Sequence, residues 1–209
     1  MALKTSVIVK SLGICIYQEI LQQMQDFTHQ RTAETPDEIW QLEHYPVFTL
    51  GQAGDKKHIL NPGHIPIMYS DRGGQVTYHG PGQLIIYILS NLPRKNLTLR
   101  QVIDSIQNSV IDLLANYNIK ATGNMDNPGV YVENAKICSL GLKVHKGCLY
   151  HGLSLNVDMD LAPFSRINPC GQENLVVTQL SNLDIKENLA TIANILITKL
   201  IGYLNYEKT

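Results

Sequence analysis

The chain has 209 residues, of which 44% are hydrophobic and 17% are charged, a composition typical of a globular protein and not of a disordered one. Seventeen basic and eighteen acidic residues give a net charge of −1, so the overall positive field that favours nucleic-acid binding is absent and no nucleic-acid partner is expected. No apolar run approaches the roughly 18 residues of a membrane span, and no membrane partner is expected either.

The start of the chain and its cysteines indicate a reducing compartment. The first apolar stretch contains a lysine and no small-residue cleavage site follows it, so it does not resemble a signal peptide, and we expect a cytoplasmic protein. The four cysteines form no C-x-x-C pair, which favours free thiols over disulfides or zinc ligands. The histidines show no metal-binding spacing, and we expect no metal and no cofactor.

Hydrophobic periodicity predicts elements along the first half of the chain. We expect a strand over 6–12, followed by an amphipathic helix over 16–29. Two short strands are predicted within 37–50, separated by a proline. A second β-rich block covers 66–70 and 75–89, and its turns are rich in glycine.

The second half of the chain contains the clearest helix. Thr98 is a suitable cap for it, and apolar residues repeat at three-and-four spacing as far as Asn116. An antiparallel meander is predicted over 129–157, and a final helix over 187–203. Strands and helices mix without regular alternation, which predicts an α+β fold with a mixed, largely antiparallel sheet and packed helices, in one domain over 1–209.

Two segments combine glycines with side chains that can take part in chemistry. The first, RGGQVTYHGPGQ at 72–83, holds four glycines beside His79, although composition alone favours a hairpin with tight turns. The second, KICSLGLKV at 136–144, is followed by YHGLSLNV. Lys136 on a strand is most often a surface residue, and a histidine such as His151 is most often buried and hydrogen-bonded, so both functional assignments stay open.

A third segment, SRINPCGQ at 165–172, places Cys170 between a proline and a glycine in a predicted loop. A nucleophilic thiolate needs access and a partner that stabilises its charge, and a loop provides the access. Cys138, two positions from Lys136, is a secondary candidate thiol. Neither a G-x-S-x-G elbow nor a G-x-x-x-x-G-K-[ST] loop is present, so serine hydrolases and phosphate-loop proteins are not indicated.

Several long strings, taken in order, resemble the octanoyltransferase family of lipoate biosynthesis. They are LEHYPVFTLGQAG, SDRGGQVTYHGPGQL, KICSLGLKV, HGLSLNVDMDLAPFSRINPCG and VTQL, and they run from Leu42 to Leu180. The resemblance implies the α/β fold shared by biotin and lipoate protein ligases. It also implies the first step of endogenous lipoate biosynthesis: transfer of an octanoyl group from acyl carrier protein to a lysine of lipoyl domains in 2-oxoacid dehydrogenases and of the glycine cleavage H protein.

The same resemblance implies a set of site residues. Cys170 would be the nucleophile that accepts the acyl group, and Lys136 its acid–base partner, with His151 in support. A lysine ammonium stabilises a nearby thiolate, and the neutral amine can act as a base. The implied substrate-binding residues are Arg72, Gly73, Gly74, Gln75, Val76, Thr77, Tyr78, His79, Ser139, Leu140, Gly141, Gly152, Leu153 and Ser154.

Three other functions are compatible with parts of this pattern. An ATP-dependent lipoate-protein ligase shares the fold and a lysine like Lys136, but it forms an adenylate and has no need of Cys170. A cysteine thioesterase would use the same thiol and pass the acyl group to water. A carrier-protein binding module without catalysis would need neither side chain.

Overall fold

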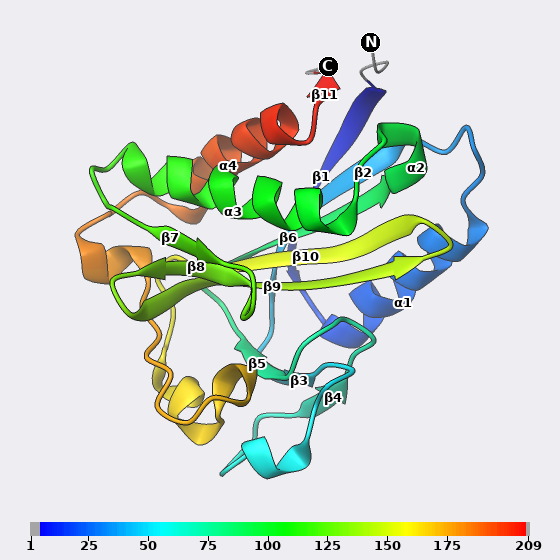
Figure 1. Ribbon diagram of the computed structural model, residues 1–209. Coiled ribbons are helices and arrows are strands. Elements are labelled where there is room, and N and C mark those ends of the chain that lie inside the picture. Colours follow the sequence, from blue (N-terminus) through cyan, green and yellow to red (C-terminus); the bar gives the residue numbers. More distant parts are fainter. Residues whose placement is uncertain (1–4, 208–209) are drawn as a thin grey trace.

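The computed structural model describes residues 5–207, and most of its strands form one eight-stranded sheet (Figure 1). The strand order is β11-β1-β2-β6-β10-β9-β8-β7. Their bounds are β1 Thr5–Cys15, β2 Asp37–His44, β6 Gln83–Asn91, β7 Thr122–Asn124, β8 Gly129–Val132, β9 Ala135–His145, β10 Cys148–Asn156 and β11 Tyr206–Glu207. Within this sheet, over residues 5–207, only β1 pairs in parallel, with β2 and β11, so the expected mixed and largely antiparallel sheet is confirmed.

Helices cover the two faces of the sheet unequally. Figure 1 shows α3 (Leu99–Ala115) and α4 (Leu189–Tyr203) on one face and α1 (Tyr17–Gln30) on the other. Strand β6 lies between them and alternates accordingly: Leu84, Ile86 and Ile88 pack in the core under α3 and α4, whereas Ile85, Tyr87 and Leu89 pack with residues of α1. Because both faces are covered, β6 is apolar almost throughout.

A second, three-stranded sheet lies on the α1 side of the main sheet. It consists of β4 (Ile67–Tyr69), β3 (Val47–Leu50) and β5 (Val76–His79), in that order. Phe48 and Tyr78 of this sheet pack against Phe164 from the 3-10 turn η2 (Ala162–Arg166). The turn η3 (Pro169–Gly171) follows η2, so the small sheet carries the segment that contains Cys170.

Capping residues account for where two of the three predicted helices begin. Thr98 and Gln101 form a capping box at the start of α3, which confirms the predicted cap. The final helix begins at Leu189, two residues later than expected, because Asn188 caps it by accepting a hydrogen bond from the backbone N–H of Thr191. The first helix begins at Tyr17, and the strand before it extends to Cys15.

Four short elements were not predicted from the sequence: β7, β11, the turn η1 (Lys56–His58) and the single helical turn α2 (Leu92–Lys95). Strands of two or three residues are too short for a period of two to show in the sequence. The turn η4 (Leu180–Leu183), which comes after the predicted loop around Cys170, was not predicted either.

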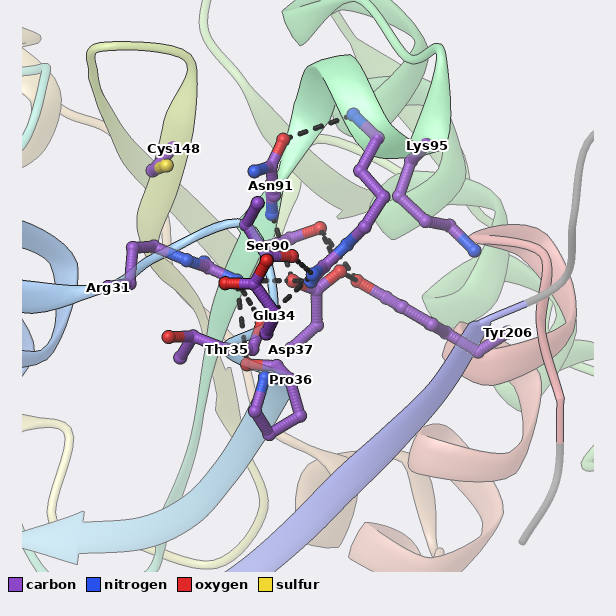
Figure 2. A network of polar contacts seen from close by, with 12 residues as sticks. Arg31, Glu34, Thr35, Pro36, Asp37, Ser90, Asn91, Lys95, Cys148 and Tyr206 are labelled. Atoms are coloured by element: carbon purple, nitrogen blue, oxygen red, sulfur yellow. Dashed lines mark hydrogen bonds and ion pairs between the residues drawn. The ribbon is translucent and has the colours of Figure 1, made fainter.

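Asp37, at the start of β2, ties together segments that are far apart in sequence (Figure 2). Its carboxylate is fully buried and accepts hydrogen bonds from Arg31, Arg94, Ser90, the backbone N–H of Asn91, and Tyr206. Two of these donors are guanidinium groups, which compensate the buried negative charge. The network therefore joins the ends of β2 and β6 to α2 and to the C-terminal strand β11.

Candidate active site

Lys136 and Cys170 meet although 34 positions separate them in the chain. Lys136 lies near the start of β9, Cys170 lies on η3, and Nζ is 3.1 Å from Sγ. The return segment is attached to β9 beside the lysine. The backbone N–H of Lys136 donates to the Val176 carbonyl at 2.8 Å, and the Thr178 N–H donates to the Lys136 carbonyl at 3.0 Å.

Cys170 occupies a tight turn in the left-handed region of backbone conformation. Its φ is 57° and that of Gly171 is 74°. The turn is held from both sides, since the Gly171 N–H donates to the Asn168 carbonyl and the Asn168 N–H donates to the His58 carbonyl. A non-glycine residue in this conformation is uncommon, and such positions concentrate at functional sites. The turn leaves the Cys170 side chain partly exposed.

Lys136 is only 2% exposed, and three neighbours fix its side chain. Nζ donates to Asn127 Oδ1 at 3.0 Å and lies 5.4 Å from the centre of the Tyr131 ring. Gly129 leaves room for the lysine stem, because a Cβ at that position would lie 2.3 Å from Lys136 Cε. Asn127 was missed from the sequence, where an asparagine before a proline indicates only a turn.

A cavity of about 380 Å³ opens beside Cys170, between the main sheet and the small sheet. From the residues expected to bind substrate, its wall contains Arg72, Gly74, Gln75, Val76, Thr77, His79, Ser139, Leu140, Gly141, Gly152, Leu153 and Ser154, together with His151. Lys136 lies beside this wall, through its contact with Cys170. The fold therefore gathers most of the expected residues around one cavity that ends at the thiol.

Two of the expected substrate-binding residues lie outside the cavity wall. Tyr78 points to the opposite face of β5 from Thr77 and His79 and packs against Phe48 and Phe164. Gly73 belongs to the turn before β5, where its N–H donates to the Leu142 carbonyl at 2.9 Å. The side chains of neighbouring residues in a strand alternate in direction, and the role in substrate binding expected for these two residues stays a prediction.

The wall also contains residues that the sequence did not indicate. They are Tyr17, Ala53, Ile85, Tyr87, Asp126, Asn127, Pro128 and Gly171. Tyr17 and Tyr87 belong to the predicted helix and to a predicted strand, but their spacing indicated only core positions. No local signal could have identified them, since their place in the wall depends on how α1 meets the main sheet.

Aromatic and imidazole rings cluster at the α1 end of the cavity. Tyr17 stacks on His79 with ring centres 6.0 Å apart, and its ring centre lies 5.1 Å from that of His44. His44 Nδ1–H donates to the Cys15 carbonyl, which leaves Nε2 to accept from the Tyr87 hydroxyl at 2.7 Å. The rings therefore pack against one another, and both ring nitrogens of His44 have hydrogen-bond partners.

Burial keeps the imidazoles of this cluster uncharged. It lowers the pKa of His44 to about 4 and holds the pKa of His79 well below its usual value. Burial also lowers the pKa of His151, although hydrogen bonding to Asp71 opposes the shift. At neutral pH these three imidazoles therefore carry no charge.

Asp71 orients His151. The neutral imidazole donates from Nε2 to Asp71 Oδ1 at 2.7 Å, and Tyr150 and Gln25 donate to Oδ2. Burial raises the pKa of the Asp71 carboxyl, but hydrogen bonds from these three donors outweigh it and hold the pKa far below its usual value. The carboxylate therefore stays charged and fixes the ring of His151 in one orientation.

Arg72 shapes the cavity wall by hydrogen bonding within the protein. Its buried guanidinium donates to the carbonyl and hydroxyl oxygens of Thr49, both at 2.8 Å, and to the carbonyls of Gly73 and Gln75. These bonds fasten the turn before β5 to β3. Gly141 lies against the same side chain, because a Cβ there would come within 2.7 Å of Arg72 Cδ.

The secondary candidate thiol is in a different environment. Cys138 is 1% exposed and packs in the main core, and burial raises its pKa to about 12. It is therefore a protonated thiol at neutral pH and a poor nucleophile. The arrangement of the two thiols favours Cys170.

Residues 5–207 show neither a metal-binding cluster nor a membrane-spanning helix. No group of three or more His, Cys, Asp or Glu side chains among these residues could hold a metal ion. No helix within the same residues is long and apolar enough to cross a membrane.

Comparison with known proteins agrees with this geometry. The model of the lipoyl protein ligase A/B catalytic domain matches residues 17–200. An octanoyltransferase of Vibrio vulnificus (strain CMCP6) is 52% identical over 206 residues, which cover 99% of this chain and 94% of the relative. An octanoyltransferase of Enterobacter sp. (strain 638) is 50% identical over 199 residues, covering 95% of this chain and 93% of the relative.

Solved structures support the fold. A lipoate-protein ligase A bound with ATP superposes with a TM-score of 0.79 at 13% identity, covering 99% of this chain and 88% of that one. A biotin protein ligase from Aquifex aeolicus in complex with biotin and ATP gives 0.59 at 15% identity, with 95% and 70% coverage. The expected biotin and lipoate ligase fold is confirmed, and the chain belongs to the octanoyltransferase family of lipoate biosynthesis.

Proposed function

We propose that this octanoyltransferase takes the octanoyl group from the thioester of acyl carrier protein and carries it on Cys170. It then passes the group to a lysine of a lipoyl domain, in 2-oxoacid dehydrogenases and in the glycine cleavage H protein, within the cytoplasm. The observation that carries the proposal is the 3.1 Å contact between Lys136 Nζ and Cys170 Sγ beside the cavity. The names of the curated relatives support the octanoyl group.

The first half-reaction loads the enzyme. The thiol proton of Cys170 moves to Lys136, and the thiolate attacks the carbonyl carbon of the carrier thioester. A bond from Sγ to that carbon forms, and the bond to the carrier sulfur breaks. The Lys136 ammonium then returns the proton to the departing thiolate, so the first half-reaction consumes no ATP.

The second half-reaction transfers the octanoyl group from Cys170 to the lipoyl domain. Lys136 is now a neutral amine, and it removes a proton from the attacking lysine of the lipoyl domain. The new amide bond forms as the bond to Cys170 Sγ breaks. The thiolate is left beside the Lys136 ammonium, and this pair can attack the next carrier thioester. One lysine therefore serves both halves, because its charge alternates between them.

The cavity suits an acyl chain. Leu140, Leu153 and Ile85 give it apolar walls, and the imidazole of His79 in the same wall is uncharged. We assign acyl binding to the expected residues that form this wall and a supporting role to His151, which Asp71 holds in place. A structural neighbour described as a bipartite lipoate ligase with its E2 lipoyl domain supports a lipoyl domain as acceptor.

One assay separates this function from its alternatives. A lipoyl domain is incubated with the enzyme and either octanoyl-loaded carrier protein without ATP, or free octanoate with ATP. The proposal predicts octanoylation of the lipoyl domain only with the loaded carrier. Modification only with octanoate and ATP would identify a ligase, and release of octanoate without modification of the lipoyl domain would identify a thioesterase.

A further inference from the structure

Asn127 makes the second polar contact of the lysine that the proposed function uses. Lys136 Nζ lies between Cys170 Sγ at 3.1 Å and Asn127 Oδ1 at 3.0 Å, and the lysine is 2% exposed. The acceptor is neutral. Within residues 5–207, no carboxylate lies at ion-pair distance from Lys136, so an amide stands where an ion-pair partner would be expected for a buried lysine.

The loop that carries Asn127 is held rigidly. Asn124 Oδ1 accepts from the backbone N–H groups of Asp126 and Asn127, at 2.9 and 3.0 Å. The buried Gln107 of α3 donates to the carbonyls of Asn124 and Gly129, which are on opposite sides of Asn127 in the chain. An amide supported in this way can fix the direction of the group that it contacts.

The hydroxyl of Tyr131 completes the support. It donates to the Asn127 carbonyl at 3.0 Å, while the Tyr131 ring lies 5.4 Å from Lys136 Nζ. The Asn127 side chain therefore faces the lysine, and its main chain is tied to β8. Neighbouring hydrogen bonds therefore support the contact between Asn127 and Lys136, which is not an isolated contact at the surface.

We propose that Asn127 is a positioning residue that aims Lys136 at the reacting atoms in both of its charge states. This inference rests on the proposed function. As an ammonium, Lys136 donates one N–H to Asn127 and one toward Cys170. As a neutral amine it has two N–H bonds and one lone pair. Because Asn127 accepts one of those N–H bonds, rotation about the last side-chain bond is restrained and the lone pair stays available for the acceptor lysine.

The neutrality of the amide matters for turnover. A carboxylate at 3.0 Å would favour the ammonium form of Lys136, so less of the loaded enzyme would hold the neutral amine from which the second half-reaction starts. An alanine would leave the lysine without its second anchor. The two substitutions Asn127→Asp and Asn127→Ala therefore predict different kinetic signatures, which a role in folding alone would not produce.

The test measures the two half-reactions separately, in single turnovers over a range of pH. Formation of the octanoyl adduct on Cys170 from loaded carrier protein reports the first, and transfer from the isolated adduct to a lipoyl domain reports the second. We expect Asn127→Ala to slow both by on the order of 10-fold or more, which matches the loss of one charge-assisted hydrogen bond. We expect Asn127→Asp to slow the second much more than the first and to move its rise with pH to higher pH.

Asn108→Ala, at an exposed position of α3, is the matched control and should leave both rates unchanged. Unfolding in urea shows whether each variant is folded. If the wild type forms the adduct and transfers it, while both Asn127 variants keep its rates and pH profiles, the role of Asn127 is wrong. Equal slowing of both half-reactions in both variants, with no change in pH profile, also contradicts it. If the wild type forms no adduct, the proposed function fails instead.

Discussion

Lys136 Nζ lies 3.1 Å from Cys170 Sγ, and the polar path continues through Nζ to Asn127 Oδ1 at 3.0 Å. The lysine comes from a strand of the main sheet, the cysteine from a turn attached to the small sheet, and the asparagine from the loop between β7 and β8. Because each side chain stands on a separately supported segment, their alignment depends on the packing of the two sheets.

Substitution of Gly129 by alanine should misplace Lys136. A Cβ at this position would come within 2.3 Å of Lys136 Cε and 2.6 Å of the Cys138 carbonyl oxygen. We expect the octanoyl transfer rate to fall on the order of 100-fold, because small displacements of a reacting group are costly. The free energy of unfolding should fall by about 1–3 kcal/mol.

Gly202→Ala is the control for this variant. Gly202 belongs to α4, and nothing lies within 4 Å of a Cβ placed there. Its transfer rate should equal that of the wild type. A Gly129→Ala protein that transfers octanoyl groups at the wild-type rate would show that the lysine does not need this space.

The reactive thiol should be identifiable by alkylation. Limited treatment with iodoacetamide at neutral pH should label Cys170, which is partly exposed on its turn, and spare Cys138, whose pKa burial raises to about 12. Peptide mass mapping locates the label. Cys138→Ala should leave octanoyl transfer unchanged, and labelling of Cys138 before Cys170 would contradict the assignment of the nucleophile.

Replacement of Asp37 should destabilise the fold without touching the cavity. Asp37→Ala leaves the guanidinium groups of Arg31 and Arg94 without their buried carboxylate and frees Tyr206 of β11. The free energy of unfolding in urea should fall by about 3–5 kcal/mol. The exposed Asp26, which contacts only Gln22 through its side chain, provides the control variant Asp26→Ala. Equal stability of the two variants would refute the role given to the network.

His44 should make stability depend on pH. Its pKa is about 4 in the folded protein and about 6.5 in an unfolded chain, so between these values the unfolded state binds the additional proton. This contribution is present above pH 6.5 and is lost as the pH falls to 4. It amounts to about 3 kcal/mol.

Urea unfolding at several pH values checks this contribution. His44→Gln keeps a donor and an acceptor but removes the titration, so stability should depend less on pH over this range. His64→Gln, at an exposed position, should leave the pH dependence as it is in the wild type. A His44→Gln profile parallel to that of the wild type would mean that His44 does not titrate in this way.

The sequence predicts the elements whose formation depends on residues close together in the chain. Helix α3 follows from apolar spacing and from the cap at Thr98, and the meander of β8, β9 and β10 follows from alternation and short turns. The parallel pairing of β1 with β2 and β11 could not be predicted. The pairing with β11 joins segments at opposite ends of the chain, where the Tyr206 hydroxyl donates to Asp37 across 169 positions.

The site residues likewise divide into those that the sequence could identify and those that it could not. Cys170 and Lys136 stand in long strings that resemble a known family, so the sequence could single them out. Tyr17 could not be recognised as part of the cavity, because its helical spacing gives it the appearance of a core residue. Tyr78 is the opposite case: it belongs to a string that supplies much of the cavity wall but points to the other face of β5, and its expected role in substrate binding stays a prediction.

The central claim is that the octanoyl group is carried on Cys170, and the intact mass of the protein tests it most directly. Wild type, Cys170→Ser and Lys136→Ala are incubated with octanoyl-loaded acyl carrier protein without ATP, and a lipoyl domain is then added. We predict one octanoyl adduct on the wild type that disappears as the lipoyl domain gains the same mass, no adduct on Cys170→Ser, and strongly slowed formation on Lys136→Ala. Transfer to the lipoyl domain by Cys170→Ser at the wild-type rate would contradict the account.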